Sequence, residues 1–297
     1  MGKRIWINKQ YILKNAANYT KNIYSVLGFL GTFFTVTEIF NLEDHDIKQK
    51  AMVTLGLLLV LFLICLIVSI IKFVNIPKIK VLQLKNDYGV YVQYGDVFSE
   101  EIIDSDIKKR NIVIPVNRCF DTLVDDDLVS SNTLHGITIK KLITEYEYTM
   151  ESLNDVIAMS LSRQRIKYKS LSEKDKRKGK LNRYPVGSIA EIGTNGNENF
   201  FLLGLSTFNY DLKAETSIEE YVVAMQKMIE YSINRSQQYP VVFPLIGAGL
   251  SRTGKDEHSL LEYIIKLIKL NSEMINSDIY IVIRDSGKES IAITDLI

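Results

Sequence analysis

Several glycine-rich and polar segments of this 297-residue chain carry residue types that can bind a phosphorylated ligand. The clearest is Tyr239–Gly254, an apolar stretch that runs into a glycine loop. Glycines let a backbone approach a ligand closely, and successive N–H groups ahead of a helix favour a phosphate. Arg252 occupies the last glycine position of a G-x-G-x-x-G fingerprint, so a Rossmann dinucleotide site is not indicated. The candidate ligand-binding residues of this loop are Gly247, Ala248, Gly249, Leu250, Ser251 and Arg252.

Polar residues also lie next to three other apolar stretches. In one of them, Gly187 and Ser188 precede the apolar run Phe200–Leu205. Gly95-Asp96-Val97 ends an early stretch with a carboxylate, and Asn117 ends a later one with an amide. Because ligands of open α/β sheets bind outside the carboxyl ends of the strands, Asp96, Asn117 and the glycine loop should converge. The candidate ligand-binding residues outside the glycine loop are Asp96, Val97, Asn117, Gly187 and Ser188.

The apolar periodicity around these residues predicts alternating strands and helices. Short apolar or alternating runs predict strands at Lys80–Leu84, Tyr88–Tyr94, Asn111–Val116, Asn199–Ser206, Val241–Ile246 and Asp278–Arg284. Apolar spacing of i, i+3 and i+4 predicts helices at Met150–Gln164, Ile218–Ser232 and Asp256–Leu270. Strands separated by helices imply an α/β sheet that is covered on both faces.

The segment Met1–Asn75 has a different composition, which predicts membrane spans. Ala51–Ile71 is uncharged and has the length of about 20 helical residues that a bilayer core requires. A second apolar run, Asn22–Phe40, follows a long basic flank and precedes no A-x-A-like cleavage site. We therefore expect a spanning helix there, with a cleaved signal peptide as the alternative. The two spans would form a hairpin within residues 1–75, followed by a soluble domain over residues 76–297.

The charges that flank the two runs predict their orientation. Five Lys or Arg residues precede the first run, and four lysines follow the second between Lys72 and Lys85. The connection Asn41–Lys50 instead holds three acidic residues against two lysines. The positive-inside rule then places both termini and the soluble domain in the cytoplasm of a two-span inner-membrane protein.

The remaining composition narrows the function. With a net charge of +1, three histidines in no H-x-x-x-H pattern and two widely separated cysteines, neither a polyanion-binding surface nor a metal site is expected. The charge-dense stretch Lys169–Arg183 is predicted to be a solvated, mobile loop. The alternative is a patch that attracts anionic headgroups or a phosphorylated ligand. Because no aromatic residues are interleaved to stack bases, no nucleic-acid partner is expected.

Taken together, these segments resemble the macro domain family. Gly95-Asp96-Val97 is similar to the family's G-D-[IV] element, and Val116-Asn117 to the start of its V-N-A-A-N strand end. Phe243–Gly249 is similar to its F-P-x-[IL]-[SG]-x-G strand and diphosphate loop, and the likeness covers most of Val81–Arg284. The resemblance implies a three-layer α/β/α domain with a mixed sheet and an ADP-ribose derivative as ligand. It also implies that Asp96 receives the adenine amino group.

The chain departs from the hydrolases of that family. Where they carry a second asparagine and a triple-glycine loop, it has Phe120, Asp121 and the acidic run Asp125–Asp127. We therefore expect a binding module and no enzyme. The alternatives are a membrane-anchored ADP-ribosyl hydrolase or deacylase, in which Asp121, Asp125 or Asp126 would act, and a tethered ADP-ribose-binding scaffold.

A two-span hairpin followed by a divergent macro domain is similar to the membrane effectors of Thoeris anti-phage defence systems. That resemblance implies a partner TIR-domain enzyme that makes an NAD-derived signal, either ADP-ribose-like or an amino-acid conjugate of ADP-ribose. It implies that the bound signal makes the hairpin disrupt the lipid bilayer, which ends in abortive infection. Since two short helices cannot line a pore alone, a homo-oligomer is expected, and no cofactor is implied.

Overall fold

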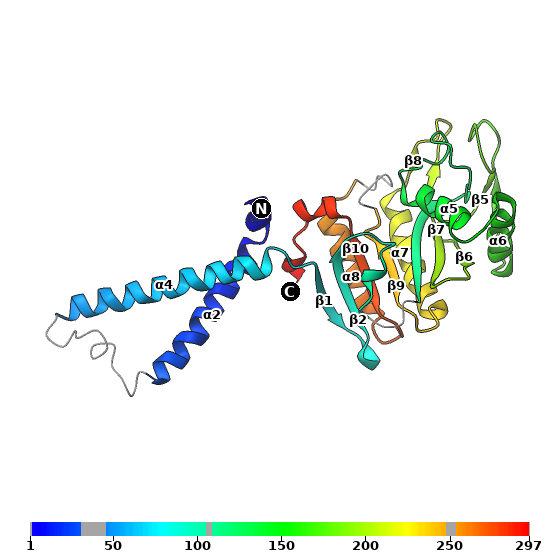
Figure 1. Ribbon diagram of the computed structural model, residues 1–297. Coiled ribbons are helices and arrows are strands. Elements are labelled where there is room, and N and C mark those ends of the chain that lie inside the picture. Colours follow the sequence, from blue (N-terminus) through cyan, green and yellow to red (C-terminus); the bar gives the residue numbers. More distant parts are fainter. Residues whose placement is uncertain (1, 31–45, 105–108, 248–253, 297) are drawn as a thin grey trace. The chain divides into compact units, whose positions relative to one another are not determined.

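The computed structural model describes residues 2–30, 46–104, 109–247 and 254–296 (Figure 1). The chain divides into two compact units. The larger unit consists of residues 78–287, and the smaller unit combines residues 1–77 with residues 288–297. The end of the chain therefore belongs with its beginning and not with the strands that precede it.

The larger unit is built on a mixed eight-stranded sheet (Figure 1). Its order is β1-β2-β10-β9-β3-β7-β6, and β8 pairs with the end of β7. Strands β2, β10, β9, β3 and β7 are mutually parallel, whereas β1, β6 and β8 run antiparallel to their neighbours. The strands are β1 Lys78–Gln83, β2 Gly89–Tyr94, β3 Arg110–Asn117, β6 Ile189–Gly193, β7 Glu198–Phe208, β8 Ala214–Glu215, β9 Val241–Pro244 and β10 Ile279–Ile283. A separate two-stranded ribbon pairs β4 Lys169–Ser170 with β5 Asn182–Arg183.

Four α-helices of this unit begin at residues that suit helix starts. Thr149 and Ser217 form capping boxes at the starts of α6 and α7, and the Asp256 side chain caps α8. The helices are α5 Leu134–Thr144, α6 Met150–Arg163, α7 Ile218–Arg235 and α8 Glu257–Leu270. Short 3-10 turns lie at η1 Lys85–Asp87, η2 Glu100–Ile102, η3 Asp285–Glu289 and η4 Ile293–Leu296.

Alternation along the strands separates two packed layers. Ile112, Ile114 and Val116 of β3 join a core cluster with residues of α5 and α6. On the other face, Phe201 of β7 meets Tyr231 of α7 with ring centroids 5.2 Å apart. Because successive strand residues point to opposite faces, the sheet lies between two helical layers. This confirms the expected α/β domain with a mixed sheet.

The smaller unit contains α1 Gly2–Ile7, α2 Lys9–Leu30 and α4 Ile47–Phe73 (Figure 1). Tyr11 and Tyr19 of α2 both pack on Phe73 at the end of α4, with ring centroids 5.1 and 6.4 Å away. Residues 51–73 of α4 are long and apolar enough to cross a membrane, and most of their large side chains are exposed. No other helix in the described ranges meets that standard. The other expected span, residues 22–40, begins in α2 and continues outside the described residues, so the hairpin remains a prediction.

Five strands and helices described in the larger unit were not predicted from the sequence: α5, β6, β8 and the two short strands β4 and β5. Strand β6 is a five-residue strand that follows a proline-containing turn, and α5 contains Gly136 together with the β-branched Thr138 and Ile139. Short length weakens a strand pattern, and glycine and β-branched residues have low helix propensity. The remaining elements expected in this unit are present, with ends that differ by a few residues.

Candidate functional site

A cavity of about 710 Å³ opens at the carboxyl ends of the five parallel strands. Its wall is built by the residues that end or follow those strands: Asp96 and Val97 after β2, Pro115–Asn117 of β3, Ser206 and Phe208 of β7, Pro244–Gly247 from β9, and Val282–Gly287 from β10. Its volume lies within the range of small-molecule sites, and its position is where open α/β sheets bind ligands. The convergence expected of Asp96, Asn117 and Gly247 is therefore present in the structure.

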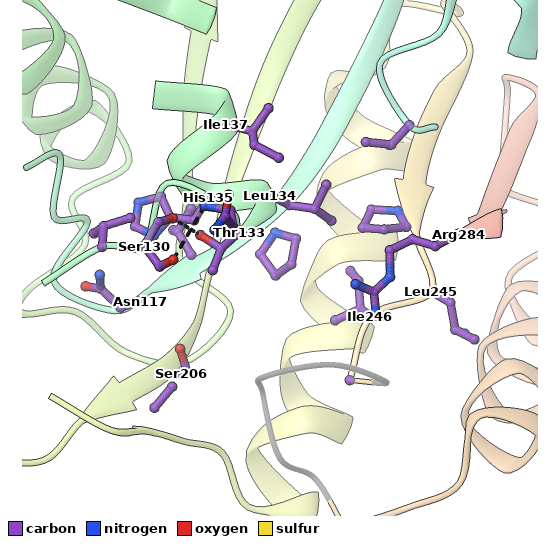
Figure 2. A pocket seen from close by; sticks show the side chains of 18 of the residues that line it. Asn117, Ser130, Thr133, Leu134, His135, Ile137, Ser206, Leu245, Ile246 and Arg284 are labelled. Atoms are coloured by element: carbon purple, nitrogen blue, oxygen red, sulfur yellow. Dashed lines mark hydrogen bonds between the residues drawn. The ribbon is translucent and has the colours of Figure 1, made fainter. Parts of the chain in front are cut away.

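Asn117 presents a buried donor at this cavity (Figure 2). Its Oδ1 accepts a hydrogen bond from the Cys119 N–H at 2.9 Å. Its Nδ2 is buried and has no hydrogen-bond partner among the described residues. Buried polar atoms are almost always paired in folded proteins. An amide nitrogen left over in a cavity wall is therefore suited to a ligand acceptor.

The Asp96 carboxylate is exposed at the same cavity, at the end of β2. Its Oδ1 accepts a hydrogen bond from the Phe98 N–H at 3.1 Å, which fixes the turn after the strand. The next residue, Val97, is buried in the core. This arrangement holds a hydrogen-bond acceptor at the cavity on a well-packed support.

The amino terminus of α5 forms another part of the wall (Figure 2). Thr133 caps the helix by accepting a hydrogen bond from the Gly136 N–H at 3.0 Å. A Cβ atom at position 136 would lie 2.2 Å from the Ser130 carbonyl oxygen, so only glycine fits there. The positive end of the helix macrodipole thus faces the cavity and favours an anionic ligand group.

His135 lies in the first turn of α5 and is buried. Burial lowers the pKa of His135 to about 4, against the smaller opposing effect of a hydrogen bond to the Asp121 backbone. The imidazole is therefore neutral at pH 7. It adds polarity to the cavity wall without adding charge.

The glycine loop reaches the cavity at Gly247, which has a φ of +90° that favours glycine. The other loop candidates, residues 248–252, lie outside the described residues. Gly187 and Ser188 are not among the residues that line the cavity in the described ranges. They form a turn in which the Gly187 N–H donates to the Gly204 carbonyl, and a Cβ at 187 would lie 2.7 Å from the Lys227 side chain.

Arg284, which was not a candidate from the sequence, follows β10 directly and lines the cavity. Figure 2 shows its side chain extending toward Ile246 at the end of β9. A guanidinium is a permanent cation with donors that match phosphate oxygens. Its place after the carboxyl end of a strand was the available signal, but only the strand order shows that β10 lies between β2 and β9. Thr133, His135 and Ser206 were likewise not predicted.

The charge-dense stretch 169–183 is not simply a solvated, mobile loop. Lys176, at its centre, is 1% exposed and lies 2.5 Å from the equally buried Asp121 carboxylate. Asp121 also accepts the Lys180 N–H at 2.7 Å, and Lys180 Nζ donates to the Phe120 carbonyl at 2.6 Å. Most of the stretch is exposed, as expected, but the expectation was wrong for Lys176, because a partner from a much earlier part of the chain neutralises this central lysine. These contacts fix the segment that follows β3, at Phe120 and Asp121, in place.

The neighbouring acidic residues are also engaged. Asp125 pairs with Lys178 at 2.5 Å, and that hydrogen bond, with backbone donors, lowers the pKa of Asp125 to about 2. Asp126 accepts the Ser131 N–H at 2.6 Å, which lowers its pKa. Asp127 lines the cavity and pairs with Arg177, whose hydrogen bond lowers the pKa of the Asp127 carboxyl. Carboxylates that are stabilised in this way are weak general bases.

A mixed sheet between two helical layers, with a ligand-sized cavity at the carboxyl ends of its parallel strands, defines a macro-like α/β domain. The family model described as "Thoeris protein ThsA, Macro domain" matches residues 90–284, which is more than half of the chain. The chain belongs to this family of ThsA macro domains.

Two known proteins match parts of this chain. The Thoeris protein ThsA of Bacillus amyloliquefaciens (strain Y2) is 26% identical over 222 residues, which are 73% of this chain and 67% of that protein. The macrodomain of Mycobacterium tuberculosis DarG matches 64% of this chain and 96% of its own chain, with 11% identity and a TM-score of 0.36.

Proposed function

We propose that this protein is a membrane-tethered receptor of anti-phage defence that binds an NAD-derived, ADP-ribose-type signal and then disrupts the membrane. The observation that carries the proposal is the unpaired, buried Nδ2 of Asn117 in a cavity at the strand ends. Membership of the ThsA macro domain family supports the Thoeris setting. A partner TIR-domain enzyme would make the signal, which is ADP-ribose or an amino-acid conjugate of it.

The chemistry of the cavity suits such a ligand. Asp96 supplies an acceptor at one strand end, as adenine recognition through its amino group requires. Arg284 and the amino terminus of α5 supply positive potential for a diphosphate. The Asn117 amide supplies a neutral donor between strand ends, which suits a ribose or phosphate oxygen.

The carboxylates near the cavity support a binding role over hydrolysis. A hydrolase would need a carboxylate or amide free to activate water next to the distal ribose. Asp121 is 1% exposed and bound by Lys176, while Asp125 and Asp126 are held by hydrogen bonds that lower their pKa. The competing function, a membrane-anchored ADP-ribosyl hydrolase that uses Asp121, Asp125 or Asp126, would have to break these contacts first.

The membrane part of the proposal rests on α4 and its surroundings. Residues 51–73 are apolar and mostly exposed, as expected of side chains that face lipid. Tyr19, Phe73 and Lys72 cluster at one end of α4, and aromatic and basic residues are enriched at membrane interfaces. With a second span over residues 22–40, both termini would lie in the cytoplasm at the inner membrane. Opening of the bilayer would require a homo-oligomer.

The test uses the full-length protein in detergent and in proteoliposomes. Calorimetry against ADP-ribose, NAD, AMP and an amino-acid conjugate of ADP-ribose should show binding of one compound of the ADP-ribose class. Mass spectrometry should find that this compound is unchanged after prolonged incubation with the protein. That ligand should release a trapped dye from proteoliposomes, and wild-type protein without it should not. Binding of none of these compounds, consumption of the ligand, or leakage without ligand would each contradict the proposal.

Reporter fusions test the topology separately. Fusions after Lys21 and after Lys85 should report the cytoplasm, and a fusion after Asp46 should report the outside. A fusion after Lys85 that reports the outside would rule out the hairpin, although ligand binding could still hold.

A further inference from the structure

The residues that line the cavity after β10 are followed directly in sequence by the last residues of the chain. Arg284, Asp285, Ser286 and Gly287 follow β10 and line the cavity. The next residue, Lys288, belongs to the smaller unit, together with the amino-terminal helices. We call residues 288–296 the carboxyl-terminal strap. Cavity-lining positions and the strap are therefore consecutive in the chain.

The strap is fastened to the amino-terminal helices. Thr294 Oγ1 donates a hydrogen bond to Asn8 Oδ1 at 2.5 Å, and both side chains are buried. Lys3 Nζ donates to Glu289 Oε2 at 3.1 Å in an exposed ion pair. The buried pair is the stronger fastening, because a lost partner would leave a polar group unpaired away from water.

Apolar burial accompanies these two contacts. Ile291, Ala292 and Ile293 of the strap are all buried. Ile12 and Ala16, which lie one turn apart on α2, are also buried. The strap is therefore an ordered part of the smaller unit.

A short 3-10 turn includes both the last cavity-lining residues and the first residues of the strap. The 3-10 turn η3 runs from Asp285 to Glu289, so one short helix begins at a cavity residue and ends at the partner of Lys3. The Gly287 N–H donates to the Arg284 carbonyl at 2.7 Å within the same stretch. A hydrogen-bonded turn transmits displacement, whereas a flexible linker absorbs it.

We infer that the carboxyl-terminal strap couples the occupancy of the cavity to the amino-terminal helices. The inference rests on the proposed function and names the regulation of that same site. A ligand that contacts residues 284–287 would favour one position of η3, and η3 would carry the strap and its grip on α1 and α2 with it. By linkage, the state of the strap must in turn affect the cavity.

Trp6 provides a reporter for the first test because it is the sole tryptophan of the chain and lies on α1. Its ring is exposed, with Lys9 Nζ 3.6 Å from the ring centroid. Excitation at the red edge of tryptophan absorption avoids absorption by adenine. Under that condition, addition of ADP-ribose should change Trp6 emission in the full-length protein.

The matched variants each carry a short, flexible Gly/Ser insertion of the same length. Insertion after Lys288 interrupts η3 and separates the cavity-lining residues from residues 289–296 of the strap. Insertion after Asn195 lengthens the exposed turn between β6 and β7. We expect both variants to bind ADP-ribose with an affinity within about tenfold of wild type. Loss of the coupling between strap and cavity would change the affinity by a factor of about this size. The Trp6 response should vanish only in the Lys288 variant. A full response in that variant would overturn the inference.

A second measurement needs no ligand and so separates this inference from the proposed function. Asn8→Leu leaves the Thr294 hydroxyl without its partner, and Asn18→Leu makes the same change at an exposed position of α2. Amide hydrogen exchange over residues 282–287 should speed up at least tenfold in Asn8→Leu and stay unchanged in Asn18→Leu. Faster exchange confined to residues 288–296 would overturn the coupling. If ADP-ribose does not bind wild type, the proposed function fails while this comparison still decides the role of the strap.

Discussion

The Nζ atom of Lys176 lies 2.5 Å from Oδ2 of Asp121, and each side chain is 1% exposed. Lys176 also donates to the Lys180 carbonyl at 2.9 Å, and Asp121 accepts the Lys180 N–H at 2.7 Å. The pair thus closes a small network in which both charges are neutralised and hydrogen-bonded. Two buried charges are tolerated only under that condition. The network ties the ribbon of β4 and β5 to the segment between β3 and α5.

Lys176→Met should therefore destabilise the protein strongly. It removes one partner of a buried pair and leaves the Asp121 carboxylate uncompensated, which typically costs about 3–5 kcal/mol. Thermal or denaturant unfolding of the full-length protein in detergent measures the loss. Lys174→Met, at an exposed position in the same stretch, is the matched control and should cost less than about 0.5 kcal/mol.

The double variant Asp121→Leu/Lys176→Met distinguishes the cost of an unpaired buried charge from the contribution of the ion pair itself. Replacing both charges with apolar side chains removes the uncompensated carboxylate, so much of the lost stability should return. If Lys176→Met alone were as stable as Lys174→Met, the buried pair would not be present in solution.

The contact between Lys176 and Asp121 could not be predicted from the sequence. The strand ends that carry Asp96, Asn117 and Gly247 were predictable because each follows a local apolar run that the fold keeps. Lys176 was predicted to be solvated because its neighbours in sequence are charged. Its burial depends on Asp121, which lies in a distant part of the sequence, and no local pattern contains that contact.

His135 should make stability depend on pH. Its pKa in the folded protein is lowered to about 4, below an ordinary value of 6.5, because it is buried. The unfolded chain then binds the proton more readily, so stability falls as pH falls from about 6.5 to about 4. The free energy of unfolding should drop by about 3 kcal/mol over this window.

His135→Gln should abolish that part of the slope, whatever its effect on stability at pH 7. His258→Gln is the control, because His258 is only half-buried on α8 and pairs with Glu262 at 3.2 Å. Denaturant unfolding at half-unit pH intervals gives both slopes. Parallel curves for wild type and His135→Gln between pH 6.5 and 4 would show that His135 is not buried in its neutral form.

Asn117→Asp should weaken ADP-ribose binding at least tenfold. The change keeps the Oδ1 acceptor that serves the Cys119 N–H, but it replaces the unpaired Nδ2 donor with an anionic acceptor. Both the lost hydrogen bond and the added charge oppose a phosphorylated ligand, and tenfold corresponds to about 1.4 kcal/mol. Asn195→Asp makes the same chemical change at an exposed turn and should leave calorimetric affinity unchanged. Equal affinity of the two variants would remove Asn117 from the site.

The site residues missed by sequence reasoning share one cause. Arg284, Ser206 and His135 reach the cavity because β10 and β7 flank the pair β9 and β3, and because α5 begins beside them. That order is set by pairing between strands as far apart in sequence as β2 and β10. The carboxyl-terminal strap was not predicted for the same reason, since Thr294 contacts Asn8 from the opposite end of the chain.

Arg284→Gln should weaken ligands that carry a diphosphate and spare those that do not. Arg284 follows β10 at the cavity and its side chain extends toward Ile246 (Figure 2), and Gly247 lines the same cavity. An anionic group bound there would meet the guanidinium. The variant keeps a polar side chain but removes the permanent charge and the forked donors of the guanidinium. ADP-ribose affinity should fall at least tenfold, about 1.4 kcal/mol, and lose part of its salt dependence, while adenosine affinity stays within twofold. Arg163→Gln, at an exposed position on α6, is the control and should match wild type for both compounds. An equal loss for adenosine and ADP-ribose would mean that Arg284 shapes the cavity without contacting the diphosphate.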